Sequence, residues 1–228
     1  MSSPETDAGV HALPLTLEFH GRELTITPTV VETDRGLILI DVGPEGAVGP
    51  LETALSDLGF SLSDLWMVVL THHDGDHAGG LAELRSRVDV PVAAHPEEAP
   101  YITGEKRPIK GDGDRYPPGT VDIELVGGSR LSTAVGPIEL LETPGHSPGH
   151  LSLYVPDERL LIAGDALVSD GDQALSGPKP EFTPEMDRAL ESVETLAALE
   201  IDHVLCFHGG YSRSGSGRIA EIARARSS

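Results

Sequence analysis

The sequence is poor in cysteine, lysine and aromatic residues. Its one cysteine, Cys206, excludes an intramolecular disulfide and a cysteine-rich zinc module. Aromatic residues are 4% of the 228 residues, and only three of the 16 basic residues are lysines. No segment approaches the roughly 18 consecutive apolar residues of a membrane-spanning helix, and residues 1–14 lack the basic and apolar regions of a secretion signal. We therefore expect a cytoplasmic protein without a membrane partner.

Positive charge is also scarce. The chain has 37 acidic and 16 basic residues, a formal net charge of −21, which argues against nucleic acid as a partner. The acidic residues are spread along the chain and 39% of residues are hydrophobic, so the composition is that of a folded protein. An acidic surface with few lysines is typical of halophilic proteins from a high-salt cytoplasm. Ordinary acidic drift is the alternative explanation.

Hydrophobic periodicity and turn residues predict strands and helices in alternation. The predicted strands lie at 23–33, 36–41, 66–70, 91–94, 121–126, 138–142, 151–155, 160–163 and 203–207. The predicted helices lie at 50–60, about 77–88, 184–199 and 216–226. Because both kinds of element occur throughout and no linker divides the chain, we expect one α+β (α/β layered) domain spanning residues 1–228.

Histidine and aspartate residues gather where these strands end, the positions at which a rigid scaffold presents functional side chains. They are Asp41, His72, Asp74, Asp76, His77, His146, Asp165 and His208. On extended backbone, the side chains of residues 72 and 74 point the same way, whereas a helix that begins near residue 77 turns Asp76 and His77 toward a second position. One short turn can therefore serve two metal ions.

Residues 71–80 (THHDGDHAGG) closely resemble the His-x-His-x-Asp-His signature of the metallo-β-lactamase superfamily. Four other marks of that family follow its order, namely Asp41 in LIDVG, residues 143–150 (TPGHSPGH), Asp165 in AGD and His208 in FHGG. The TPGHSPGH string most resembles the glyoxalase II-type hydrolases. The resemblance covers nearly the whole chain, and it implies a four-layer αββα sandwich with the site at one edge between the sheets.

The resemblance also implies the ligands of two divalent metal ions, for which zinc is expected. The first ion would be bound by His72, Asp74 and His146, and the second by Asp76, His77 and His208, with Asp165 bridging. The mechanism implied for such a site is hydrolysis by a hydroxide shared between the metals. Asp76, as a proton acceptor, and Asp165 are the expected catalytic residues.

Position 74 departs from the family signature, which has a second histidine there. His73 stands beside Asp74, but adjacent residues of an extended chain point to opposite faces, so we do not expect His73 to substitute. A carboxylate is a harder ligand than an imidazole. Fe²⁺ or Mn²⁺ is therefore also possible in the first site.

Three functions fit these observations. The first is a metallo-hydrolase of a small ester-like substrate such as a thioester, a lactone or a related acyl compound. The second is a mononuclear Fe(II) sulfur (persulfide) dioxygenase, in which the counterparts of His72, His146 and Asp165 hold the iron. The third is a non-catalytic binding domain with a degenerate metal site.

Two features have open interpretations. Asp41 either hydrogen-bonds a metal ligand or only caps the turn after its strand. The single concentration of positive charge, formed by Lys106, Arg107, Lys110 and Arg115, indicates either an anionic substrate or an ordinary charged loop.

Overall fold

The computed structural model describes residues 9–19, 21–110, 115–169 and 174–225. The elements before residue 125 are β1 (Val10–Ala12), β2 (Leu15–Phe19), β3 (Arg22–Ile26), β4 (Thr29–Thr33), β5 (Gly36–Ile40), α1 (Val48–Asp57), β6 (Leu65–Val69), α2 (Gly75–Ala78), α3 (Leu81–Arg87), β7 (Val92–Ala94), α4 (Ala99–Ile102) and β8 (Ile123–Glu124). The later elements are β9 (Arg130–Thr133), β10 (Gly136–Glu142), β11 (Leu151–Val155), β12 (Leu160–Gly164), β13 (Val168–Ser169), β14 (Leu175–Ser176), α5 (Met186–Ala197), β15 (His203–Cys206), β16 (Gly210–Ser212) and α6 (Ser216–Arg224). Short 3₁₀ turns lie at Leu62–Asp64, Pro156–Glu158 and Pro180–Phe182.

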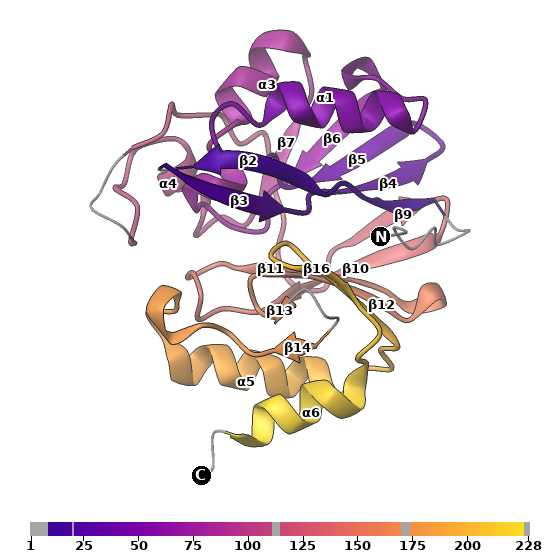
Figure 1. The fold of residues 1–228 in the computed structure, drawn as a ribbon, viewed down its shortest axis with the longest axis vertical. Helices are drawn as coiled ribbons and strands as arrows, with labels where there is room; N and C mark the ends of the chain where they lie inside the picture. The colour runs from indigo at the N-terminus through magenta and orange to yellow at the C-terminus, as the bar shows by residue number, and fades with distance from the viewer. Residues whose placement is uncertain (1–8, 20, 111–114, 170–173, 226–228) are drawn as a thin grey trace.

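Two six-stranded sheets form the centre of the molecule. Their strand orders are β1-β4-β5-β6-β7-β8 and β16-β15-β12-β11-β10-β9. Figure 1 shows α1 and α3 over the outer face of the first sheet and α5 and α6 over the outer face of the second. The predicted four-layer αββα sandwich is confirmed.

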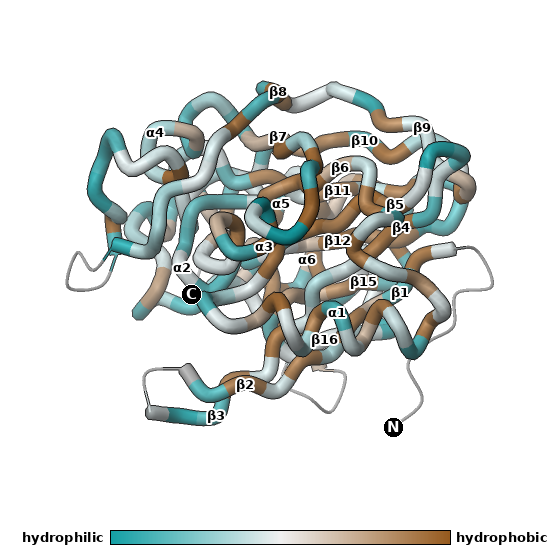
Figure 2. Tube along the Cα trace, turned by 90° about the horizontal axis from the view of Figure 1, so that it is seen from above, coloured by the Kyte–Doolittle hydropathy of each residue, from teal (hydrophilic) through white to brown (hydrophobic). Residues whose placement is uncertain are grey.

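The central strands are apolar on both faces because each sheet lies between two other layers. In β5, Leu37 and Leu39 belong to the core beneath α1 and α3. Ile38 and Ile40 belong to the core between the two sheets. Figure 2 shows hydrophobic segments running through the middle of the molecule along β6, β11 and β12, with hydrophilic segments such as β3 at the margin. Among the described residues, no helix has both the length and the apolar character needed to cross a bilayer.

Several predicted elements were wrong in extent. Residues 23–33 form parts of two strands because Pro28, which has no amide proton for a sheet ladder, lies between β3 and β4. The helix expected over about 77–88 divides into α2 and α3, since Gly80 N–H bonds the carbonyl of Gly43 instead of continuing a helix. The strand expected at 121–126 shortens to β8, and β1, β2, β9, β13, β14 and β16 were not predicted. Residue 226 of the last predicted helix lies outside the described residues.

The loop between β10 and β11 is anchored on α5. The carbonyl of Gly145 accepts a hydrogen bond from Glu185 N–H at 3.1 Å, and Ser192 Oγ donates to the carbonyl of Pro144 at 2.8 Å. Gly145 has φ of +129°, and a Cβ there would collide with the backbone of Ala189. Only glycine therefore allows this loop to lie against the helix.

Gly145→Ala should lower the free energy of unfolding by about 3 kcal/mol, because it adds backbone strain to a steric collision. Gly128→Ala is the matched control, since Gly128 also has a positive φ, +81°, but no atom lies within 4 Å of the added Cβ. Urea unfolding of both variants measures the difference. Equal destabilisation would show that the contact with α5 has no role.

Candidate metal centre

The candidate residues meet at the carboxyl ends of two parallel strand pairs. β5 pairs with β6 and β12 with β15, all in parallel. Asp41 and His72 follow the first pair, and Asp165 and His208 follow the second. Parallel strands place their carboxyl ends at one edge of a sheet, which is where ligands of layered α/β proteins bind.

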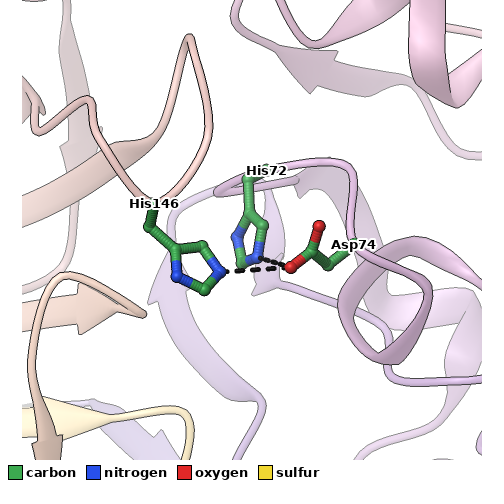
Figure 3. Close-up of side chains that lie close together, drawn as sticks. All are labelled: His72, Asp74 and His146. Carbon is green, nitrogen blue, oxygen red and sulfur yellow. Dashed lines mark hydrogen bonds and ion pairs between the residues drawn. The ribbon is translucent and has the colours of Figure 1, made fainter. Parts of the chain in front are cut away.

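His72, Asp74 and His146 form one group that could hold a metal ion. His72 Nε2 lies 3.3 Å from Asp74 Oδ2, and His146 Nε2 lies 3.1 Å from the same oxygen. Figure 3 shows the three side chains converging, with both imidazoles directed toward the Asp74 carboxylate.

Asp76, His77 and His208 form a second group of the same kind. His208 Nε2 lies 3.1 Å from Asp76 Oδ2. Asp165 lies between the groups, with Oδ1 3.3 Å from His77 Nε2 and Oδ2 3.3 Å from His146 Nε2. The fold thus brings all seven of the predicted metal ligands into one cluster.

Several atoms of this cluster have no hydrogen-bond partner within the described part of the chain. His72 Nε2, His77 Nε2 and Asp165 Oδ1 are buried and make no hydrogen bond, although each lies 3.3 Å from an atom of opposite charge type in the cluster. Such atoms are uncommon because burying a polar group without a partner costs free energy. Imidazole nitrogens and a carboxylate oxygen that face one another in this way are the donor set of a divalent metal site, so the residues fit the metal that the sequence implies.

Asp41 orients two of the candidate ligands. Its Oδ2 lies 2.8 Å from His77 Nδ1 and accepts a hydrogen bond of 2.7 Å from Thr71 Oγ1. Because a carboxylate only accepts, His77 Nδ1 carries the proton, and because the Thr71 hydroxyl proton is used, Thr71 accepts from His72 Nδ1 at 3.0 Å. In the neutral form of each ring, the Nε2 lone pair therefore faces the cluster. Of the two interpretations of Asp41, the structure shows the hydrogen bond to a candidate ligand.

A second buried network supports Asp165. The Asp165 backbone N–H donates to His150 Nε2 at 3.0 Å, and Thr143 Oγ1 lies 2.8 Å from His150 Nδ1. Burial holds the pKa of His150 well below its usual value. The neutral ring can therefore accept from Asp165 and donate to Thr143, which fixes the backbone from which Asp165 projects.

His73 pairs through Nδ1 with the buried carboxylate of Glu98, while its Nε2 lies 3.9 Å from Asp74 Oδ1. Glu98 Oε2 also accepts the backbone N–H of His73 at 3.0 Å, while Oε1 accepts hydrogen bonds of 2.7 Å from Ser147 Oγ and Gly149 N–H. One carboxylate therefore joins the loop that carries His72 to the loop that carries His146. Sequence reasoning did not identify Glu98, which has no motif around it.

Burial and the charges within the cluster shift the pKa values of its members in different directions. Burial, followed by the nearby His77, lowers the pKa of His72 well below its usual value. Burial alone would raise the pKa of Asp165, but His77 and His208 outweigh it and hold that pKa well below its usual value. Burial lowers the pKa of His77, yet Asp165, Asp41 and Asp76 together raise it well above its usual value. A neutral His72, an ionised Asp165 and carboxylates that attract positive charge suit a cation.

Lys110 enters the first group, which sequence reasoning did not predict. Its Nζ forms an ion pair with Asp74 Oδ2, lies 2.5 Å from His146 Nε2 and donates to the carbonyl of His146 at 3.1 Å. The signals in the sequence were the place of Lys110 in the single concentration of positive charge and the unusual carboxylate at position 74.

Comparison with known proteins identifies the family of the chain. Residues 21–208 match the family model of the metallo-beta-lactamase superfamily. The probable metallo-hydrolase YflN of Bacillus subtilis is 32% identical over 201 residues, which cover 75% of each chain. A hydroxyacylglutathione hydrolase of Ruegeria pomeroyi is 31% identical over 185 residues, covering 81% of this chain and 62% of that enzyme. The alignments thus span about three fifths of the hydroxyacylglutathione hydrolases.

Solved structures share the fold. A metallo-beta-lactamase family protein of Thermus thermophilus superposes with a TM-score of 0.76 at 24% identity, covering 96% of this chain and 79% of that chain. A metallo-beta-lactamase of Pontibacter korlensis gives a TM-score of 0.74 at 19% identity, covering 98% of both chains. The family match over most of the sequence, together with these relatives and the histidine and aspartate cluster, shows that the chain belongs to the metallo-beta-lactamase superfamily and is a metallo-hydrolase.

Proposed function

We propose that this metallo-hydrolase cleaves a small ester-like substrate, a thioester, a lactone or a related acyl compound, at a site for two divalent metal ions. His72, Asp74 and His146 are the ligands of the first ion, and Asp76, His77 and His208 those of the second. The observation that carries the proposal is the position of Asp165, whose two oxygens face the two groups as a bridging ligand would. We infer that zinc is the metal, with Fe²⁺ or Mn²⁺ as alternatives at the carboxylate of Asp74.

Metal ions bound there would polarise the substrate carbonyl and activate a water molecule. The protein itself orients the imidazole nitrogens that would bind these ions. Asp41 and Thr71 keep the lone pairs of His72 and His77 directed into the site. Asp76 is partly exposed, with a side chain 23% accessible, so it can reach substrate and accept a proton.

The substrate class is supported by relatives and by charge. Hydroxyacylglutathione hydrolases, by name enzymes of a glutathione thioester, are among the relatives at about 30% identity. Lys106 and Arg107 are exposed just after α4. Lys106 Nζ lies 5.3 Å from the centre of the Tyr101 ring, which stacks on His73 beside the cluster. We infer that this positive charge favours an anionic substrate.

We also infer that the chain is one domain, because residues of both sheets share a single central core.

Metal analysis joined to a substrate screen tests the function. Purified protein should contain zinc and hydrolyse one of a panel of thioesters, lactones and phosphoesters, assayed at low and molar salt. Chelation should abolish the activity, and Asp165→Ala should lower kcat/KM by at least about a hundredfold. Asp57→Ala, an exposed carboxylate on α1, is the matched control and should leave the activity unchanged. Iron with oxygen consumption on a persulfide would instead identify a sulfur dioxygenase.

Asp41→Asn should weaken metal binding by about 10- to 100-fold, because the amide cannot accept every hydrogen bond that fixes His77 and Thr71. Asparagine tolerates the φ of +60° found at Asp41, so the backbone should keep its shape. Zinc titration with a competing chelator measures the change, and circular dichroism checks the fold. An unchanged zinc affinity in the folded variant would remove Asp41 from the ligand-positioning network.

A further inference from the structure

The proposed first metal site contains a cation supplied by the chain. Lys110 Nζ contacts Asp74 Oδ2, His146 Nε2 and the carbonyl oxygen of His146. An ammonium group has three protons to donate, and these three acceptors match them. Its side chain and that of Asp74 are each 17% accessible, so the ion pair is largely shielded from water.

The ammonium and a metal ion need the same atoms. An imidazole nitrogen has a single lone pair, so His146 Nε2 can accept a hydrogen bond from Lys110 or bind a metal, but not both. Asp74 Oδ2 is likewise the oxygen nearest to both His72 and His146, at 3.3 and 3.1 Å. Two positive charges this close would also repel each other strongly.

The proposed second metal site has no such competitor. Among the described residues, no lysine or arginine forms an ion pair with Asp76 or Asp165, whose partners are His77, His146 and His208. The two sites therefore differ in what a metal must displace, although both offer two imidazoles and a carboxylate.

We propose that Lys110 is a tethered cation of the first metal site, so that a metal ion binds there only by displacing the ammonium group and binds more weakly than at the second site. The departure at position 74 and Lys110 then explain each other, because the carboxylate that replaces a histidine is the charge that holds the lysine. The inference rests on the proposed metal ligands and adds an order of filling to them.

Metal stoichiometry of the full chain tests the proposal. After chelation, the protein is titrated with Zn²⁺ by calorimetry, and zinc is counted after desalting. The wild type should retain one equivalent, whereas Lys110→Met, which keeps the length of the side chain and removes its charge, should retain two. Its first-site affinity should rise by about tenfold or more, as for other close charge pairs. Lys106→Met, four residues away and outside the cluster, is the control and should retain the same zinc content as the wild type.

A double-mutant cycle examines the link to position 74. In the Asp74→His background, Lys110→Met should change the first-site affinity much less than it does in the wild type, because the carboxylate that holds the ammonium is gone. Equal effects of Lys110→Met in the two backgrounds, or two equally tight equivalents in wild type and Lys110→Met, would overturn the inference. If neither protein binds zinc, the proposed metal centre itself is wrong.

Lysine reactivity gives a second readout that needs no variant. The chain has only three lysines, so amine acylation followed by mass spectrometry can resolve Lys110 from Lys106. Acylation of Lys110 should be slow in chelator-treated protein and faster with saturating zinc, while that of Lys106 stays constant. An unchanged rate at Lys110 would contradict displacement.

Discussion

The site depends on the hydrogen bonds that the buried carboxylate of Asp41 accepts. It lies at the end of a central strand, in a left-handed backbone conformation, with only 1% of its surface exposed. Its oxygens accept hydrogen bonds from Thr71 N–H, Thr71 Oγ1 and His77 Nδ1. A strained, desolvated carboxylate is stable there only because each oxygen is satisfied. The same hydrogen bonds decide which nitrogens of His72 and His77 face the cluster. The left-handed backbone at Asp41 is therefore part of what orients these two candidate ligands.

The other parts of the site are held by buried networks of the same kind. His150, Thr143 and Ser152 connect the backbone of Asp165 to the carbonyl of Ala163 through hydrogen bonds of 2.8 to 3.0 Å. Glu98 joins the loops that carry His72 and His146. The candidate ligands come from both sheets, so their mutual distances are set by these polar networks at the edge of the sandwich as well as by the apolar core between the sheets.

Charge distinguishes the two halves of the cluster. Within the described part of the chain, Asp76 and Asp165 form ion pairs only with histidines, whereas Asp74 has the ammonium of Lys110 beside it. Lysine is rare in this chain, which has a net charge of −21 and only two other lysines, so a lysine in this position is notable. A carboxylate that has a lysine ammonium beside it is electrostatically satisfied without a metal ion. The same scaffold can therefore hold two sites of unequal affinity.

The sequence by itself determined the family and the strand-end residues, because the His72 to His77 spacing and the other motifs are local properties. The resemblance to that family then implied the four layers. It also predicted that His73 would not replace the ligand at position 74, and His73 is in none of the groups of described residues that could hold a metal ion. It divided some elements wrongly, as at Pro28 and Gly80. Only the tertiary structure decided that Lys110 reaches Asp74 and His146, and that Glu98 joins two loops, because these contacts cross 25 to 51 residues between loops without any periodic pattern.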